Sequence, residues 1–440
     1  MGFTKFGLSD QVLKGVHAAG YTVPTPVQSL AIQPALAGKD IIGCAQTGTG
    51  KTAAFVLPML HRLSRGQNSS SRIRPRALVL TPTRELAQQV NDAVISYGRF
   101  LNLRAVPIYG GVSMVNQLKL LRRGVDIVIA TPGRLLDHLQ RKTVDLSTIE
   151  VLVLDEADRM LDMGFVQDVR KIIGNLPKDR QTLMFSATVS REITTLAGDI
   201  LRNPEMVQVG QRHNPAETIE QHFYAAPRET KTSLLLHALE AERMKSVLLF
   251  SATKHGADRI CRRLERSGIS CTAIHSNRTQ AQRQRALNGF KEGRFRVLVA
   301  TDIAARGIDV DAISHVINFD IPHSAEDYIH RIGRTGRAGT SGKAVTFVGN
   351  DERHHLRKIE QFIRGRFPLK TYPGFKPVSE EKTSRESGPS SARVGRPKSH
   401  THGFQSKHKP HSKKHGVEHR KNRKPAHKME AYSTSFDGAR

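Results

Sequence analysis

The stretch Ala45-Gln46-Thr47-Gly48-Thr49-Gly50-Lys51-Thr52 constrains this chain more than any other. It follows the apolar segment 41–44 and precedes the helix-forming run 53–57, so it is the turn from a strand into a helix. A glycine-rich turn in that position predicts a phosphate-binding loop, whose backbone N–H groups curl around phosphate oxygens. Lys51 would supply charge to the β and γ phosphates, and Thr52 a hydroxyl to Mg²⁺. The strict pattern has Gly where Ala45 stands, and an incidental Gly/Thr-rich turn is the alternative.

Length and cysteine content favour a multidomain protein of a reducing compartment. The 440 residues predict two or three domains, each large enough for its own core. The three cysteines, Cys44, Cys261 and Cys271, have no metal-type spacing and are expected to be buried small residues. No apolar run is long enough to span a bilayer, and the first residues lack a signal-peptide core. We therefore expect a cytoplasmic protein without a membrane contact.

The charge of the chain favours a polyanionic partner. The formal net charge is +28, of which +10 falls on residues 376–440 and +18 on residues 1–375. Because the excess is present in both parts, nucleic acid is a better explanation than a merely soluble surface.

Four apolar runs follow the phosphate loop, and each ends in a polar cluster. The runs are 77–80, 125–129, 151–154 and 182–185, and the clusters are 81–86, 130–134, 155–158 and 186–188. Near-continuous apolar strands that alternate with helices indicate an α/β fold with a parallel sheet covered on both faces. Such sheets bind ligands beyond the carboxyl ends of their strands, where all four clusters fall.

The acidic cluster 155–158 closes one of these strands. Asp155 in that place predicts a site for Mg²⁺, held through the ion's own waters. Glu156 beside it can orient and deprotonate an attacking water. Alone, the cluster could merely cap the next helix; paired with Lys51, it favours the metal site.

The N-terminal segment offers two candidates for adenine recognition. The Gln28 amide is both donor and acceptor and could match the edge of adenine, while Phe3 could stack on its face. Spacing alone favours a surface amide and an aromatic core residue instead.

The second half repeats the strand-and-helix layout without a phosphate loop. The periodicity lapses over 203–226, which indicates a linker and an entering strand. A second series of apolar strands follows at 247–250, 270–274, 297–299, 316–320 and 344–347. This half carries glycine-punctuated arginines at 306–309 and 330–337. Planar guanidinium groups suit phosphate, so these predict arginine fingers, with a basic patch for nucleic-acid backbone as the alternative.

Taken together, these residues resemble the DEAD-box ATP-dependent RNA helicases, and most of all the bacterial RhlE-type branch. The segment 155–158 is the motif that names the family, and the resemblance runs from Phe3 to about Phe367. Its other motifs are 21–28, 45–52, 82–86, 110–111, 131–134, 186–188, 300–309 and 330–337. The family tolerates Ala at position 45. It usually has Gly after the histidine of His275-Ser276, so Ser276 departs from it.

The resemblance implies two tandem RecA-like domains with parallel sheets, followed by a disordered basic tail. The implied boundaries are 1–208 for the first domain, which includes an adenine-recognition segment at 1–29, then 209–217 for a linker, 218–371 for the second domain and 372–440 for the tail. The composition of the tail agrees with disorder, because it cannot bury enough apolar surface to fold. Its positive charge should raise RNA affinity in a salt-sensitive way, with a purely solubilising tail as the alternative.

The resemblance also implies a role for individual residues. The catalytic set is Lys51, Asp155, Glu156, Arg334 and Arg337. The ATP-binding set is Phe3, Tyr21, Gln28, Ala45, Gln46, Thr47, Gly48, Thr49, Gly50, Lys51, Thr52 and Asp309, with Thr52 and Asp155 serving Mg²⁺. The RNA-binding set is Pro82, Thr83, Arg84, Gly110, Gly111, Thr131, Gly133, Arg134, Thr253 and Thr301. Ser186, Ala187, Thr188 and His330 would couple the two domains.

The implied activity is RNA-stimulated ATP hydrolysis that unwinds short RNA duplexes or remodels RNA–protein complexes with little sequence preference. Single-stranded and short duplex RNA are the expected partners of a monomer, with ribosomal or RNA-degradation proteins as candidates. A non-enzymatic RNA clamp and a DNA-translocating helicase are the rival functions. Intact Glu156, Arg334 and Arg337 disfavour the clamp, and Gln28 and segment 155–158 disfavour the DNA helicase.

Overall fold

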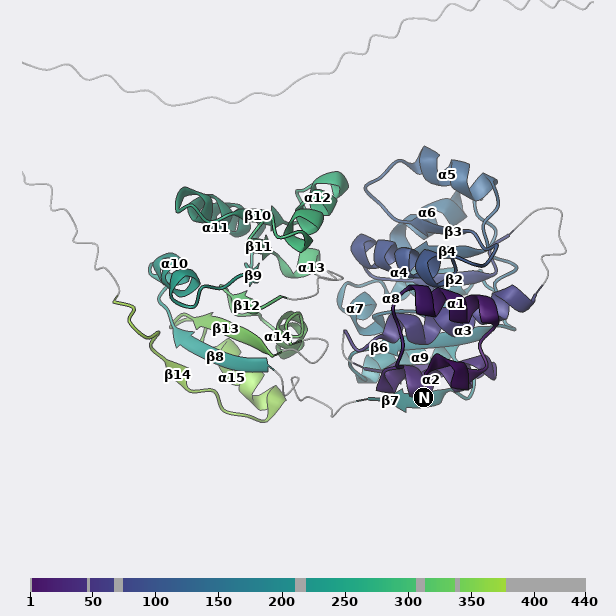
Figure 1. Cartoon of the computed structure of the whole chain (residues 1–440), viewed down its shortest axis with the longest axis horizontal. Coiled ribbons are helices and arrows are strands. Elements are labelled where there is room, and N and C mark those ends of the chain that lie inside the picture. Colours follow the sequence, from purple (N-terminus) through teal and green to yellow (C-terminus); the bar gives the residue numbers. More distant parts are fainter. Residues whose placement is uncertain are drawn as a thin grey trace, which may run out of the picture. The chain divides into compact units, whose positions relative to one another are not determined.

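Two parallel sheets of seven strands each organise the chain (Figure 1). The computed structural model describes residues 2–45, 48–66, 74–209, 219–305, 313–336 and 341–376. We call the described residues up to 209 the first domain and those from 219 to 376 the second domain. The predicted linker lies outside the described residues apart from Val209, and so does the tail from 377 onward. No helix among the described residues is long and apolar enough to cross a membrane.

The first domain alternates strands with helices. Its strands are β1 (Ile41–Cys44), β2 (Ala77–Leu80), β3 (Ala105–Ile108), β4 (Ile127–Ala130), β5 (Val151–Leu154), β6 (Gln181–Ser186) and β7 (Glu205–Gln208). Its helices are the 3₁₀ turn η1 (Phe3–Phe6), α1 (Asp10–Ala18), α2 (Pro26–Leu36), α3 (Lys51–Arg65), α4 (Arg84–Tyr97), α5 (Met114–Arg122), α6 (Pro132–Gln140), α7 (Ala157–Asp162), α8 (Val166–Ile173) and α9 (Arg191–Ile200).

The second domain has the same alternation. Its strands are β8 (Ile219–Ala225), β9 (Val247–Phe250), β10 (Cys271–Ile274), β11 (Val297–Ala300), β12 (His315–Asn318), β13 (Gly342–Val348) and β14 (Leu369–Lys370). Its helices are α10 (Lys231–Ala241), α11 (Lys254–Arg266), α12 (Gln280–Lys291), α13 (Asp302–Ala305), α14 (Ala325–Ile332) and α15 (Arg353–Ile363).

The two sheets share one topology. The strand order is β3-β4-β2-β5-β6-β1-β7 in the first and β10-β11-β9-β12-β13-β8-β14 in the second. Each number in the second order is seven higher than its counterpart in the first, so the chain traces the same path twice. All neighbouring strands run parallel, which confirms the predicted α/β class with two parallel sheets.

Each sheet is buried on both faces. In β2, Ala77 and Val79 pack into one hydrophobic cluster of the first domain, while Leu78 and Leu80 pack into the cluster on the opposite face. Successive side chains of a strand point to opposite faces, so a strand between two helix layers must be apolar at every position. This explains the unbroken apolar runs of the central strands and places their polar ends at one edge of each sheet.

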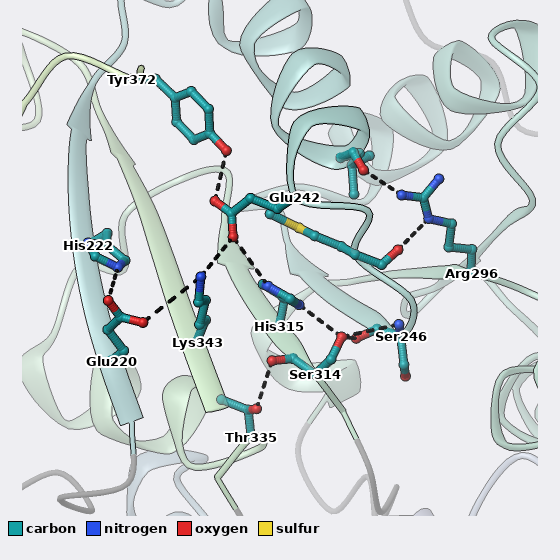
Figure 2. Close-up of polar contacts among 12 residues, drawn as sticks. Glu220, His222, Glu242, Ser246, Arg296, Ser314, His315, Thr335, Lys343 and Tyr372 are labelled. Atoms are coloured by element: carbon teal, nitrogen blue, oxygen red, sulfur yellow. Dashed lines mark hydrogen bonds and ion pairs between the residues drawn. The ribbon is translucent and has the colours of Figure 1, made fainter. Parts of the chain in front are cut away.

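The described chain ends in residues 369–376, which begin with β14 and which we call the strap of the second domain. β14 is the last strand of the second sheet, and Tyr372 just beyond it is buried against Tyr224 with ring centroids 4.7 Å apart. The Tyr372 hydroxyl donates to Oε1 of Glu242 at 2.8 Å, and Figure 2 shows the second oxygen of Glu242 facing Lys343 and His315. Tyr372 is therefore part of the second-domain core, although the predicted tail starts at this residue.

Candidate functional site

The phosphate loop joins the end of β1 to the start of α3. Gly48 and Gly50 have φ values of 85° and 91°, a left-handed conformation that favours glycine. At Gly50 a side chain would also collide, because a Cβ there would lie 2.4 Å from Nε2 of Gln28. Gln46 and Thr47, two predicted members of the loop, lie outside the described residues.

Lys51 is held inside this loop. Its side chain is buried, and its Nζ donates to the carbonyl oxygen of Ala45 at 2.7 Å. The amide of Ala45 donates in turn to the carbonyl oxygen of Ser186 at the end of β6. Lys51 is thus a buried cation whose hydrogen-bond partner in the described chain is a neutral carbonyl, which suits the binding of an anion.

Gln28 ties the start of α2 to the same loop. Its Oε1 accepts a hydrogen bond from the amide of Thr25 at 2.9 Å, and its Nε2 donates to the carbonyl oxygen of Gly50 at 3.1 Å. Gln28 is fully buried, so it is not the surface amide that its spacing favours.

The two aromatic candidates for adenine lie in different environments. Phe3 is fully buried, and its ring meets that of Phe6 edge-on with centroids 6.0 Å apart. Tyr21 is 40% exposed, packs edge-on against Tyr97 and lines the cavity at the loop. Phe3 is not among the residues that line this cavity, so the structure brings Tyr21 to the site and leaves Phe3 in the core.

A cavity of about 580 Å³ brings most of the predicted ATP-site residues together. Its lining includes Gln28, Tyr21, Gly48, Gly50, Lys51, Thr52, Asp155, Glu156 and Arg334. Donors for phosphate, carboxylates for a metal ion and an arginine therefore face one space. Asp309 and Arg337, which were predicted to complete the site, lie outside the described residues.

Asp155 and Glu156 follow the last residue of β5. Both are buried, and Glu156 has a positive φ of 51°, which is uncommon for a residue with a side chain. Burial raises the pKa of Asp155 to about 7, with Lys51 opposing the rise and Glu156 adding to it. One oxygen of Glu156, Oε2, has no hydrogen-bond partner among the described residues and lies 3.8 Å from Nε of Arg159.

These two carboxylates fit a divalent cation. A cation would favour the charged form of the buried Asp155, and a water of its shell could satisfy the orphaned Glu156 oxygen. Among the described residues there is no cluster of three His, Cys, Asp or Glu side chains that could enclose a metal. A cation held partly by water and phosphate does not need such a cluster, so the residues suit Mg²⁺ better than a protein-enclosed metal.

Asp158 links the acidic segment to the predicted coupling residues. Its Oδ2 accepts hydrogen bonds from the amides of Ala187 and Thr188, both at 3.0 Å, and from the Thr188 hydroxyl at 3.2 Å. The end of β5 is thereby tied to the segment after β6. Asp158 was not among the predicted site residues, although its place in the acidic cluster was a usable signal. His330, also predicted for coupling, is buried in the last turn of α14.

The predicted RNA-binding residues of the first domain gather at the carboxyl ends of β2, β3 and β4. Thr83 caps α4 by accepting from the amide of Leu86 at 3.3 Å, and Thr131 is the N-cap residue of α6. Pro82, Gly133 and Arg134 are their immediate chain neighbours.

The glycine pair beside them makes room for an arginine. A Cβ on Gly111 would lie 2.0 Å from Nη1 of Arg84, and Gly110 also lies next to this guanidinium. Arg134 donates to Val112 O at 3.1 Å and to Oε1 of Gln117 at 3.0 Å. Gln117, which was not among the predicted site residues, is a buried amide in a mostly exposed helix, and no sequence signal distinguishes it.

Arg331 and Arg334 of the second domain, although close in the sequence, have different surroundings. Arg331 is buried and donates to both oxygens of Asp302, at 2.6 and 2.8 Å, and also to Asp320 O at 2.7 Å. It therefore fixes α14 to the strand ends, whereas Arg334 lines the cavity beside the phosphate loop. The predicted RNA contacts Thr253 and Thr301 follow β9 and β11, and Thr253 caps α11 by accepting from the amide of Gly256 at 2.9 Å.

Comparison with known proteins gives two family matches and close relatives. Residues 25–196 match the DEAD/DEAH box helicase family, and residues 230–339 match the helicase conserved C-terminal domain. The chain is 42% identical over 364 residues to the ATP-dependent RNA helicase CshA of Listeria monocytogenes, covering 83% of this chain and 69% of that protein. It is 43% identical over 384 residues to the ATP-dependent RNA helicase DeaD of Mycobacterium tuberculosis, covering 87% of this chain and 67% of that protein.

Solved structures show the same arrangement of secondary structure. Saccharomyces cerevisiae Dbp5 bound to RNA and ADP BeF3 has a TM-score of 0.75 at 31% identity, over 84% of this chain and 95% of that one. The DEAD-box helicase Mss116 bound to ssRNA and UDP-BeF has a TM-score of 0.78 at 28% identity, over 86% of this chain and 80% of that one.

Proposed function

The chain belongs to the DEAD/DEAH box helicase family, and we propose that it is an ATP-dependent RNA helicase that couples RNA binding to ATP hydrolysis. Its two sheets are tandem RecA-like domains. The observation that carries the proposal is the single cavity that Lys51, Asp155, Glu156 and Arg334 share. That combination serves phosphoryl chemistry, in which positioning and charge stabilisation supply most of the catalysis.

Each of these residues receives a distinct role. Lys51 binds the β and γ phosphates, and Thr52 and Asp155 hold Mg²⁺, which supplies charge to offset the phosphate oxygens. Glu156 orients the attacking water and accepts its proton, a role that its orphaned buried oxygen supports. Arg334 and Arg337 stabilise the charge that develops on the transferred phosphoryl group, and Asp309 completes the site.

The base is recognised by the N-terminal segment. Tyr21 and Tyr97 are the aromatic side chains in the cavity lining, and Tyr21 is the exposed one of the two, so we assign it contact with the nucleotide. Gln28 holds the loop through Gly50 and offers its amide to adenine. Phe3 supports this segment from the core.

RNA binds along the carboxyl ends of both sheets. Thr83, Arg84, Gly110, Gly111, Thr131 and Arg134 form the first-domain part of this surface, with Pro82 and Gly133 between them, and Thr253 and Thr301 form the second-domain part. Contacts of this kind reach the phosphate backbone, so little sequence preference is expected. Asp158, Ser186, Ala187, Thr188 and His330 transmit the binding of RNA to the ATP site. Local separation of short duplexes or remodelling of RNA–protein complexes is the expected outcome.

Several finer assignments belong to the same proposal. We place the chain in the cytoplasm as a monomer, and its three cysteines, all buried, suit a reducing compartment. The RhlE-type branch and ribosomal or RNA-degradation partners remain predictions from the sequence.

Steady-state ATPase activity with and without single-stranded RNA tests the proposal. The full chain should hydrolyse ATP slowly alone and faster with RNA, and an equal mass of single-stranded DNA should stimulate it less. E156Q should bind a fluorescent ATP analogue as the parent does while losing about 10²- to 10⁴-fold in turnover, the usual contribution of a general base. E192Q, a change at an exposed glutamate of α9, is the matched control and should leave turnover unchanged.

Robust turnover without RNA would reject the coupling of RNA binding to hydrolysis, and equal stimulation by DNA would favour the DNA helicase. Turnover that stays absent with RNA while ATP-dependent RNA binding persists would favour the clamp. Loss of nucleotide binding in E156Q would reject its role as the base.

A further inference from the structure

A groove of about 770 Å³ lies in the second domain along α11, outside the cavity at the phosphate loop. Its lining reaches from Thr253, the N-cap residue of α11, to Arg266 in the last turn of that helix. Arg228, from the segment before α10, also lines it. Six cationic side chains and three carboxylates face this groove, so its surface is predominantly positive.

The cations of α11 form one exposed face. Arg259, Arg262, Arg263 and Arg266 are all exposed. Arg262 and Arg263 are adjacent, and each lies three or four residues from Arg259 and from Arg266, so the four side chains share one side of the helix. In the part of the chain that the structure describes, none of these four arginines forms an ion pair with a carboxylate, and Arg228 forms none either. Their charges are therefore available to an anionic ligand.

The acidic residues of α11 point elsewhere. Asp258 and Glu265 lie roughly 100° around the helix from the centre of the arginine face. Asp258 contacts Nε2 of His275 at 2.9 Å and Nη2 of Arg278 at 2.8 Å. The close contacts of the Asp258 carboxylate are therefore with residues outside the arginine face.

Two of the three carboxylates in the groove already have partners. Glu352 pairs with the buried Nζ of Lys231 at 2.7 Å. Asp320 accepts from the Ser251 hydroxyl at 3.1 Å and the Ala252 amide at 2.8 Å, which holds the loop before Thr253. Asp351 is the remaining carboxylate, against the five arginines Arg228, Arg259, Arg262, Arg263 and Arg266.

Helix stability alone does not account for this pattern. Cations in the last turn stabilise a helix through its dipole, which explains Arg263 and Arg266. Arg259 stands in the middle of α11 and Arg228 precedes α10, so neither gains from that effect. Their convergence on one groove indicates a ligand.

We propose that this arginine face is a second track for the RNA backbone, continuing outward from Thr253. The inference rests on the proposed RNA helicase function, because Thr253 at one end of the groove is a predicted RNA contact. The arginines recur about every 5.4 Å along the helix, which lets successive side chains reach successive phosphates of one strand. Phe319 is the aromatic residue in the lining, and it is buried. The track would therefore bind the charged phosphates of RNA and would not bind bases by stacking.

The test compares short and long RNA on the full chain. The double variant R259Q/R263Q removes two charges from the groove, and R243Q/K245Q removes two exposed charges from the loop between α10 and β9, at the opposite edge of the same sheet. Binding of fluorescently labelled oligouridine of about 6 and about 16 nucleotides is measured by anisotropy with a non-hydrolysable ATP analogue at several salt concentrations. Equal melting temperatures establish that both variants fold.

We expect R259Q/R263Q to bind the long RNA roughly fivefold more weakly and the short RNA as the parent does. For the long RNA, the slope of log affinity against log salt should shrink by about 1.4, since each phosphate contact of a single strand contributes about 0.7. The control variant should match the parent in both measurements.

Equal weakening for both lengths, unchanged binding, or the same loss in the control would overturn the proposal. A labelled polyglutamate peptide provides a further test. If the peptide binds the parent but not R259Q/R263Q, while long RNA binds both proteins equally, the groove binds an acidic protein and the proposal is overturned. RNA-stimulated ATPase activity with the short RNA, measured on the same samples, distinguishes a failure of the proposed helicase function from a failure of the arginine track. If the parent shows none, the helicase function fails; if the parent shows it and the long RNA is unaffected by R259Q/R263Q, only the track fails.

Discussion

The side-chain amide of Gln28 donates a hydrogen bond to the carbonyl oxygen of Gly50 across 3.1 Å. The first turn of α2 is thereby locked to the phosphate loop, 22 residues further along the chain. Gly50 permits this contact because its left-handed backbone carries no side chain and a Cβ would lie 2.4 Å from the same amide nitrogen. The loop shape and the adenine-recognition segment therefore depend on one another.

G50A should separate the loop from Gln28 and weaken ATP binding. An alanine in the left-handed region costs about 1 to 2 kcal/mol, and the collision with Gln28 adds to that, so the Kd for a fluorescent ATP analogue should rise at least about tenfold. G198A in α9, where a Cβ meets nothing within 4 Å, is the control and should bind ATP as the parent does. ATP affinity that stays within twofold of the parent in G50A would show that the loop adapts without this contact.

Asp158 makes a second testable connection, between the acidic segment and the residues after β6. D158A removes the acceptor of three hydrogen bonds from Ala187 and Thr188 and leaves Lys51, Asp155 and Glu156 in place. We expect ATP binding to persist while duplex unwinding, followed by release of a labelled RNA strand, falls by about tenfold or more. D162A, at an exposed residue of the same short helix, should unwind normally. If D158A unwinds the duplex at the parent rate, Asp158 has no role in coupling RNA binding to the ATP site.

The central strands could be predicted from the sequence because burial on both faces demands apolar residues throughout. The edge strand β10 was predicted as well, but the edge strands β3, β7 and β14 were not. β3 contains Pro107, which an edge strand tolerates because one side of its backbone has no partner. β7 and β14 are partly exposed and read Glu205–Gln208 and Leu369–Lys370, sequences with no apolar run.

The site residues divide in a similar way. Lys51 and Asp155 could be found because the chemistry of phosphate and metal binding fixes their types and their places at strand ends. The partners that position them could not, since Gln28 and Gln117 act through single hydrogen bonds that depend on the folded backbone. The different roles of Arg331, which holds the fold, and Arg334, which lines the cavity, could not be predicted either, because both residues belong to one arginine cluster in the sequence.

The strap of the second domain should make stability depend on pH through Glu242. Burial alone would raise the pKa of Glu242, but the hydrogen bond from Tyr372 and the charge of Lys343, with a further contribution from His315, lower it below its ordinary value of 4.5. The unfolded chain therefore binds this proton more readily than the folded one. The stabilisation by Glu242 is fully present above about pH 4.5 and is lost as the pH falls through the lower pKa of the folded state.

E242Q should lower the melting temperature by about 3 °C at pH 7, as expected for about 1 kcal/mol in a domain of this size. The difference from the parent should shrink steadily below about pH 4.5, because the parent then loses the charge that the variant lacks. Burial lowers the pKa of His315 and the charge of Glu242 opposes that shift, so protonation of His315 also destabilises the fold at low pH, and more so in E242Q, which lacks the carboxylate. Y372F, which keeps the ring and removes the donor, should show a smaller deficit of the same pH dependence. E292Q, at an exposed glutamate paired with Arg294, should melt with the parent at every pH. A deficit in E242Q that stays constant down to pH 3 would show that Glu242 stabilises the strap by packing and not by its charge.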